Sequence, residues 1–345
     1  MIAYVVRRLL LFPVVLWGVT ILVFATFMLL TPQQRVATYV QSPSELHGGP
    51  EAINRLIDKY GLDDPFAVQY GRWLGGVLRG NLGWSQSASM PVSEAVGRLL
   101  PATAELALLS IIPVIWGGIV LGSAAAVHHN HAVDHVLRFF SMVSRTFPSF
   151  VFGLIALMIL YGKFGWFPPG RLSPWATEVV SSAGFHRYTG MNVVDAIMNG
   201  NLRVLWDALR HLILPVAILS AQSWAGLLRI MRSSMLETLR QDYITTARAK
   251  GLKNSDVVKV HARRNALLPL VTVGGLWMAY LMGGVVVIET VFNYNGLGRF
   301  AANAAQQLDF PAVLGFTLLF AAVLVGVNLI IDVLYAFLDP RIRLG

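Results

Sequence analysis

The feature that most constrains the fold is a set of long apolar stretches with few charged residues. A helix needs about 20 predominantly apolar residues to cross the hydrocarbon core of a bilayer. Six stretches reach that length: 9–31, 101–127, 138–161, 208–230, 267–292 and 311–337. Only 13% of the residues are charged, about half of the share in an average soluble domain. We therefore expect an all-α integral membrane protein with six transmembrane helices.

The basic residues predict how these helices are oriented. Arg7 and Arg8 precede the first stretch without an acidic neighbour, and short segments rich in Lys and Arg stay in the cytoplasm. Six crossings then place both termini in the cytoplasm, with Arg341 and Arg343 near the C-terminus. The first stretch is too long for the apolar part of a signal peptide and lacks a small-residue cleavage site, so we expect it to be a retained helix.

This alternation divides the chain into three parts. Residues 1–31 form an N-terminal tail and the first helix, 32–100 an external segment, and 101–345 a core of five helices with a cytoplasmic loop at 231–266. The external segment is expected to contain helices at 51–60 and 66–78, with Gly61 ending the first as a left-handed C-cap. The second membrane helix is expected to begin at Pro101, because proline is favoured at the first helical position.

The segment 231–269 is polar and basic although it lies between two apolar stretches. Eight Arg or Lys residues against three acidic ones give it a net charge of +5. The spacing predicts a helix over 232–250, ended by Gly251, and a second helical stretch over 255–264. One face of the first helix is expected to carry Met235, Leu239, Tyr243 and Ala247. Small residues between the charges suit insertion into a partner's groove; a solvated pair of surface helices is the alternative.

Several classes of protein are disfavoured by the sequence. It has no cysteine, which excludes disulfides and thiolate chemistry. It lacks a P-loop, an H-E-x-x-H and a G-x-S-x-G motif, so we expect neither an enzyme nor direct ATP binding. The basic balance is interpreted as a topology signal rather than a nucleic-acid footprint, because the basic residues lie in short loops between apolar spans.

Three smaller features remain open to more than one reading. The histidines at 128, 129, 131 and 135 have only Asp134 beside them, which favours a solvated turn over a metal site. Glu105 and Glu289 lie toward the outer ends of their spans, and a proton-driven transporter would need a chain of acids at mid-depth. Gly118 and Gly122 fit the G-x-x-x-G pattern of close helix packing.

The run Asp-Tyr-Ile-Thr-Thr-Ala-Arg-Ala-Lys-Gly-Leu at 242–252 resembles the coupling loop of ABC-importer permeases. The resemblance is to the B-type, or first permease, subunit of the oligopeptide/dipeptide/nickel family. Further matching stretches occur in family order at 60–65, 79–83, 100–106, 261–269, 289–292, 296–299 and 339–343. They cover nearly the whole chain.

The resemblance implies a type I importer fold and a set of partners. These are a second homologous permease, two cytosolic ABC ATPases that carry ATP and Mg²⁺, and an external substrate-binding protein. A heteromeric permease pair is favoured over a homodimer, and both remain open. No cofactor is expected on this chain. The residues implied in ATPase coupling are Asp242, Tyr243, Ala247, Arg248, Ala249, Lys250, Gly251 and Leu252. Thr245 and Thr246 depart from the general Glu-Ala-Ala-x-x-x-Gly pattern, so that part of the motif is altered.

The resemblance also implies the substrate class without assigning substrate-binding residues. Di- and oligopeptides are expected, with nickel chelates, glutathione and oligosaccharides as alternatives within the same family. A proton-driven secondary transporter is the alternative from another class, and a membrane-embedded enzyme is disfavoured by the missing catalytic motifs. The external segment is expected to contact the binding protein or to gate the mouth of the pathway.

Overall fold

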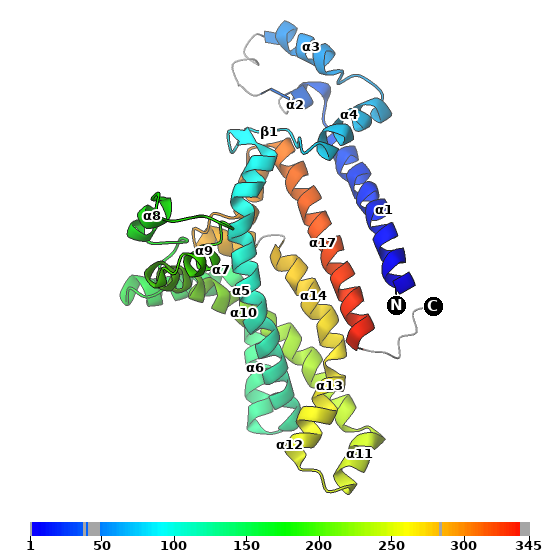
Figure 1. The fold of residues 1–345 in the computed structure, drawn as a ribbon, viewed down its shortest axis with the longest axis vertical. Coiled ribbons are helices and arrows are strands. Elements are labelled where there is room, and N and C mark those ends of the chain that lie inside the picture. Colours follow the sequence, from blue (N-terminus) through cyan, green and yellow to red (C-terminus); the bar gives the residue numbers. More distant parts are fainter. Residues whose placement is uncertain (1, 37–38, 41–48, 283–284, 339–345) are drawn as a thin grey trace.

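The computed structural model describes residues 2–36, 39–40, 49–282 and 285–338 of the chain. The described part is mostly helical, as expected. Figure 1 shows an elongated molecule with the small helices α2–α4 at one end and α11–α12 at the other. The C-terminal arginines Arg341 and Arg343, and the motif at 339–343, lie outside the described residues.

The elements follow one another along the chain with a single short hairpin among the helices. The N-terminal part contains α1 (Ile2–Phe27), α2 (Pro32–Val36), α3 (Gly49–Tyr60), α4 (Phe66–Leu78), β1 (Trp84–Ser85) and β2 (Met90–Pro91). The middle part contains α5 (Val92–Val127), α6 (Ala132–Thr146), α7 (Ser149–Ala156), a π-helical turn η2 (Leu157–Lys163), α8 (Pro174–Ser181), α9 (Asn192–Met198) and α10 (Leu202–Leu239). The C-terminal part contains α11 (Asp242–Ala249), α12 (Asn254–Asp256), η3 (Val257–Ala262), α13 (Arg263–Ala266), α14 (Leu268–Met282), α15 (Val286–Val291), α16 (Leu297–Gln306) and α17 (Phe310–Leu338).

The central packing unit is the seam between α5 and α10. A side chain built on Gly118 would place its Cβ 2.7 Å from the Cβ of Leu227, and one on Gly122 would lie 2.5 Å from the Cβ of Met231. Both distances are far inside van der Waals contact, so the two helices approach as closely as they do only because these positions are glycine. The G-x-x-x-G prediction is therefore confirmed as a helix-packing motif.

Within the described residues, four helices are long and apolar enough to cross a membrane: Leu9–Phe27, Val92–Val127, Leu202–Leu239 and Phe310–Ile331. The expected continuous span at 138–161 is wrong. In its place α6 and the α7–η2 unit meet at a bend of 99°. Pro148 is the reason, because the residue before a proline avoids the helical region, and Phe147 is extended there with ψ 133°.

The expected span at 267–292 is also divided. Helix α14 ends at Met282 and a separate helix, α15, covers Val286–Val291, while Gly283 and Gly284 lie outside the described residues. The apolar part of α14, Leu268–Leu281, is shorter than a full span. Apolar composition alone therefore overestimated the length of this helix.

At the N-terminal end of the molecule the structure confirms the predicted helices, but it differs from the prediction in the segment that follows them. Helices α3 and α4 confirm the two predicted helices, and Gly61 is left-handed with φ +59°, as expected of a C-cap. The hairpin β1–β2 was not expected. The start of the second membrane helix at Pro101 is wrong, because α5 already begins at Val92 and carries Pro101 inside it. Ala95 and Val96 on one side of the proline and Ala102 on the other are buried, so α5 is packed against its neighbours on both sides of Pro101.

Candidate functional site

The segment that follows α10 forms a small helical unit at one end of the molecule (Figure 1). The expected helix over 232–250 is two helices, because α10 stops at Leu239 and α11 starts at Asp242. Gln241 between them is extended, with ψ 149°. The second predicted stretch is confirmed as a continuous run of α12, η3 and α13.

Gly251 closes α11 as a Schellman C-cap. Its φ is +77°, its amide donates to the Arg248 carbonyl at 2.9 Å, and the Leu252 amide donates to the Ala247 carbonyl at 3.4 Å. This pair of bonds defines the motif, and the left-handed residue in it is usually glycine. A Cβ built on Gly251 meets nothing within 4 Å. The backbone conformation, and not a close approach within this chain, is what requires glycine here.

The inner side of this unit is apolar. Ile244, Val257, Ala262 and Ala266 are fully buried and join Met235 in one cluster with residues of α5 and α14. The predicted face is therefore partly wrong, because the break at Gln241 rotates α11 so that Ile244 faces inward and Tyr243 is 43% exposed. Ala247 is buried too, so it packs inside the unit and does not form part of its outer surface.

The outer side of the unit carries the remaining residues that sequence reasoning assigned to it. Asp242, Tyr243, Arg248, Ala249, Lys250, Gly251 and Leu252 are all exposed, as are Thr245 and Thr246. The Tyr243 hydroxyl accepts a hydrogen bond from the Asn265 amide at 2.9 Å, which connects α11 to α13. The unit thus presents small and basic residues on a surface held rigid from behind by an apolar core.

A buried ion pair connects the C-terminal part of α10 to the start of α6. Arg232 donates from Nε and Nη2 to the two carboxylate oxygens of Asp134, at 2.7 Å each, and Asp134 is completely buried. This guanidinium holds the pKa of Asp134 well below its usual range. The expected solvated histidine turn is thus anchored rather than free, since His129 Nδ1 lies 3.0 Å from Arg232 Nη2. Among the described residues no group of three or more His, Cys, Asp or Glu is arranged for a metal ion.

Glu105 of α5 is the centre of a polar network that sequence reasoning missed. Its Oε1 accepts from the Val193 amide at 2.6 Å, and its Oε2 accepts from Arg171 at 2.9 Å and from the Tyr294 hydroxyl at 3.1 Å. Burial raises the pKa of Tyr294, so its hydroxyl stays protonated and donates. The available signal was a carboxylate in an apolar stretch, which requires a partner, but its partners lie 66 to 189 residues away.

Glu289 has a comparable role at α16. One carboxylate oxygen accepts from the Thr103 hydroxyl at 2.8 Å and the other from the Arg299 amide at 2.8 Å, in the first turn of that helix. Thr103 in turn accepts from the Leu297 amide at 2.8 Å. A carboxylate beside the free amides of a helix N-terminus is favourable. Glu105 and Glu289 each have fixed structural partners, which is the arrangement of two helix anchors and not of a relay.

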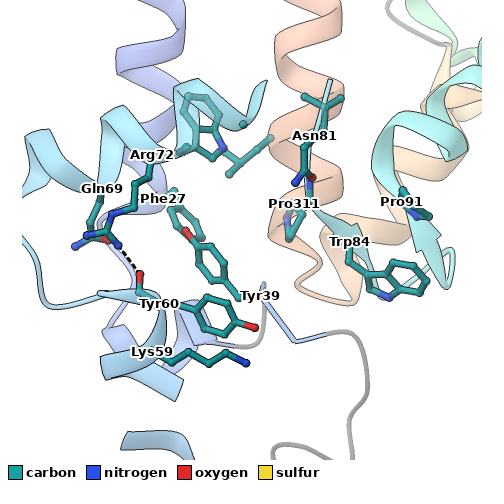
Figure 2. A pocket seen from close by; sticks show the side chains of 15 residues that line it. Phe27, Tyr39, Lys59, Tyr60, Gln69, Arg72, Asn81, Trp84, Pro91 and Pro311 are labelled. Carbon is teal, nitrogen blue, oxygen red and sulfur yellow. Dashed lines mark hydrogen bonds between the residues drawn. The ribbon is translucent and has the colours of Figure 1, made fainter. Parts of the chain in front are cut away.

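A cavity of about 480 Å³ opens at the far end of the molecule, between the ends of α1 and α3, helix α4, the hairpin and the start of α17 (Figure 2). Aromatic residues line much of it, with the rings of Tyr39 and Tyr60 stacked at 5.0 Å. Arg72 donates to the Tyr60 carbonyl at 2.7 Å, the bond drawn in Figure 2. The sequence had indicated helices here but not this hollow.

These features define a polytopic α-helical membrane protein with a rigid, exposed helical unit at one end and a small helical subdomain at the other. Residues 118–344 match the family model described as "Binding-protein-dependent transport system inner membrane component". The chain belongs to this family. It is therefore a multi-pass protein of the bacterial inner membrane with a transport role.

Individual relatives cover the chain from end to end. It is 38% identical to the "Oligopeptide transport system permease protein AppB" of Bacillus subtilis, over 99% of this chain and 100% of the relative. It is 37% identical to the "Dipeptide transport system permease protein DppB" of Escherichia coli K12, over 99% of both chains. The "Dipeptide transport system permease protein DppB" of Alkalihalophilus pseudofirmus is 36% identical, over 99% of this chain and 100% of the relative.

Proposed function

We propose that this chain is a permease subunit of an ATP-driven ABC importer that moves di- or oligopeptides into the cytoplasm. The observation that carries the proposal is the end-to-end similarity to permeases named for peptide transport. The rival reading, a proton-driven transporter, is disfavoured because Glu105 and Glu289 are committed to fixed partners. Nickel chelates, glutathione and oligosaccharides are the alternative substrates within the family.

The proposed topology follows from the charge pattern. Both termini and the 231–266 loop face the cytoplasm, and the end that carries α3 and α4 faces outward. Six crossings satisfy this arrangement when the bent α6–α7–η2 unit and the α14–α15 pair each count as one. The outer cavity and the α3–α4 subdomain then lie where an external binding protein would deliver substrate.

The proposed partners meet the chain at different surfaces. A second, homologous permease completes the membrane pathway, and two cytosolic ATPases carry ATP and Mg²⁺. One ATPase docks on the outer side of α11, with Asp242, Tyr243, Arg248, Ala249, Lys250, Gly251 and Leu252 as the contact surface. Ala247 supports that surface from behind, because it is buried against the apolar core of the unit. Basic side chains around small residues suit a groove with acidic rims.

Substitution of Gly251 tests the docking role. Since a Cβ at this position meets nothing within the chain, we expect Gly251→Trp to leave the permease in the membrane, to strain the left-handed turn and to block the approach of a partner. We expect peptide uptake by right-side-out vesicles to fall at least tenfold, with the variant present at wild-type level. Wild-type uptake by Gly251→Trp would refute the docking role.

A matched variant, Gly251→Asn, separates the effect of the backbone conformation from the effect of added bulk on the docking surface. Asn tolerates the left-handed conformation, so Gly251→Asn keeps the turn and adds a small side chain outside it. If the partner approaches Gly251 closely, the Asn variant is impaired to an intermediate degree. If uptake falls in the Trp variant and stays normal in the Asn variant, the turn tolerates a small side chain. Identifying the external protein that stimulates uptake, and the peptide it carries, tests the substrate class independently.

A further inference from the structure

A basic groove lies between α6 and the last third of α10. Its volume is about 450 Å³, and four arginines line it: Arg138 and Arg145 from α6, and Arg229 and Arg232 from α10. None of the lining residues is acidic. Four guanidinium groups around one hollow create a local positive potential that favours a bound anion.

Three of these arginines have no carboxylate partner in the described part of the chain. Arg232 is bound to Asp134, whereas Arg138, Arg145 and Arg229 form no ion pair there and are exposed. Guanidinium groups present paired N–H donors that match two oxygens of a phosphate. The groove therefore has an intact structural ion pair at one side and three free phosphate-binding groups around it.

The surface beside the arginines is apolar. Val136, Phe139 and Met142 on α6 are 64%, 63% and 61% exposed, and Met142 itself lines the groove. Helix α6 is also half of the bent pair that is apolar enough for a membrane span. It lies toward the end of the molecule that carries α11 and α12 (Figure 1). In the topology proposed above, on which this inference rests, this end of α6 is the cytoplasmic end of a crossing, and arginines beside an exposed apolar surface there lie at the depth of the lipid headgroups.

We propose that this groove binds the headgroup phosphate of an anionic glycerophospholipid from the leaflet nearest the 231–266 loop. Arg138 and Arg145 hold the phosphate from α6 and Arg229 holds it from α10, while the acyl chains lie against Phe139 and Met142. The lipid then bridges two helices that the Asp134–Arg232 pair already connects. Free phosphate offers the same oxygens but has no apolar part to use the α6 surface, which is why the lipid is the favoured source.

Native mass spectrometry of the full-length chain, purified in the assembly with which it extracts from the membrane, tests the proposal. The probes are dioleoyl-phosphatidylglycerol, the zwitterionic dioleoyl-phosphatidylcholine and inorganic phosphate. The variant is Arg138→Ala/Arg145→Ala/Arg229→Ala, which leaves the structural residue Arg232 in place. With about 1 kcal/mol for each arginine near anionic lipid, binding of phosphatidylglycerol is expected to weaken on the order of 100-fold.

A control with the same loss of charge is Arg55→Ala/Arg187→Ala/Arg203→Ala, since these arginines are exposed and lie outside the groove. It is expected to keep wild-type binding of phosphatidylglycerol. Arg138→Lys/Arg145→Lys/Arg229→Lys is expected to recover part of the affinity, which also shows that the groove is folded. Wild-type binding by the Ala triple variant, or equal loss in the control, overturns the proposal. Displacement of the lipid by equimolar inorganic phosphate overturns the lipid source.

Discussion

The seam between α5 and α10 and the helical unit after α10 both depend on glycine, for opposite reasons. At Gly122 a Cβ would lie 2.5 Å from the Cβ of Met231, so the seam needs glycine for space. At Gly251 a Cβ would meet nothing, and the turn needs glycine for its φ of +77°. Around Gly122 the space is filled by other residues of the same chain, whereas the space around Gly251 is free for another molecule. The same residue type therefore marks an internal contact in one region and an available surface in the other.

Removal of Asp134 tests whether the two regions are joined at Arg232, and the largest effect is expected here. Asp134→Ala leaves the Arg232 guanidinium partly buried without its carboxylate. Breaking a buried ion pair in this way costs about 3 kcal/mol. Glu94→Ala, which breaks the exposed Glu94–Arg98 pair, is the control and should cost less than about 1 kcal/mol. Thermal unfolding in detergent, followed by tryptophan fluorescence, measures both. Equal shifts in the two variants would show that the Asp134 pair is no more important than a surface pair.

The pH dependence of the same variant has a defined sign. Arg232 lowers the pKa of Asp134 in the folded protein, so the stabilisation is complete above the ordinary aspartate pKa of about 3.9 and is lost as the pH falls below it. The stability difference between wild type and Asp134→Ala should thus be present at neutral pH and should shrink as the pH falls below about 3.9.

Gly122→Ala tests whether the seam between α5 and α10 has room for a side chain at this position. The added methyl group meets the Met231 side chain and the Leu228 carbonyl oxygen, the latter at 2.9 Å. The backbone must shift to accept it, which costs about 1–3 kcal/mol in a well-packed interior. The unfolding temperature in detergent should fall accordingly. An unchanged temperature would mean that the two helices separate without cost.

Gly251→Ala tests whether the turn requires glycine only for its backbone conformation. With free space around the Cβ, the cost is limited to the left-handed backbone, about 1 kcal/mol. Gly251→Asn should be less destabilising than Gly251→Ala, because Asn visits this conformation more readily. The order of the two unfolding temperatures is the measurement. The reverse order would indicate a side-chain clash instead of backbone strain.

Gly226→Ala is expected to have the smallest effect and the opposite sign. Gly226 lies inside α10, and a Cβ there meets nothing within 4 Å. Alanine in a helix interior is favoured over glycine by about 0.5–1 kcal/mol. A small rise in unfolding temperature is therefore expected, in contrast to Gly122→Ala. A loss of stability would reveal a contact at this face of α10.

The features of the fold that could be predicted are those that depend on residues close together in the sequence. The helices at 51–60 and 66–78, and the left-handed glycines 61 and 251, follow from periodicity and capping, which depend on residues a few positions apart. Prolines were harder to interpret. Pro13, Pro101, Pro113 and Pro215 lie inside helices, whereas Pro148 ends one. A linear pattern does not show which of these prolines is accommodated within a helix.

In the candidate site, too, some features could be predicted from nearby residues and others depend on distant ones. Its charge and the left-handed Gly251 could be found from the sequence, whereas its start could not, because α10 continues to Leu239. The inward turn of Ile244, the burial of Ala247 and the Arg232–Asp134 pair could not, because they depend on the break at Gln241 and on a partner 98 residues away. The network around Glu105 is similarly long-range, although an acid in an apolar stretch is a signal that a partner exists.

Helix α10 has a mechanical consequence that follows from its length. Its 38 residues make a rod about 57 Å long, nearly twice the hydrocarbon thickness of a bilayer. A tilt of about 10° at one end of a rod of that length displaces the other end by about 10 Å. Since only Arg240 and Gln241 separate α11 from this rod, a tilt that begins at the helical unit and is carried by α10 moves the far end of the helix by a distance of this order.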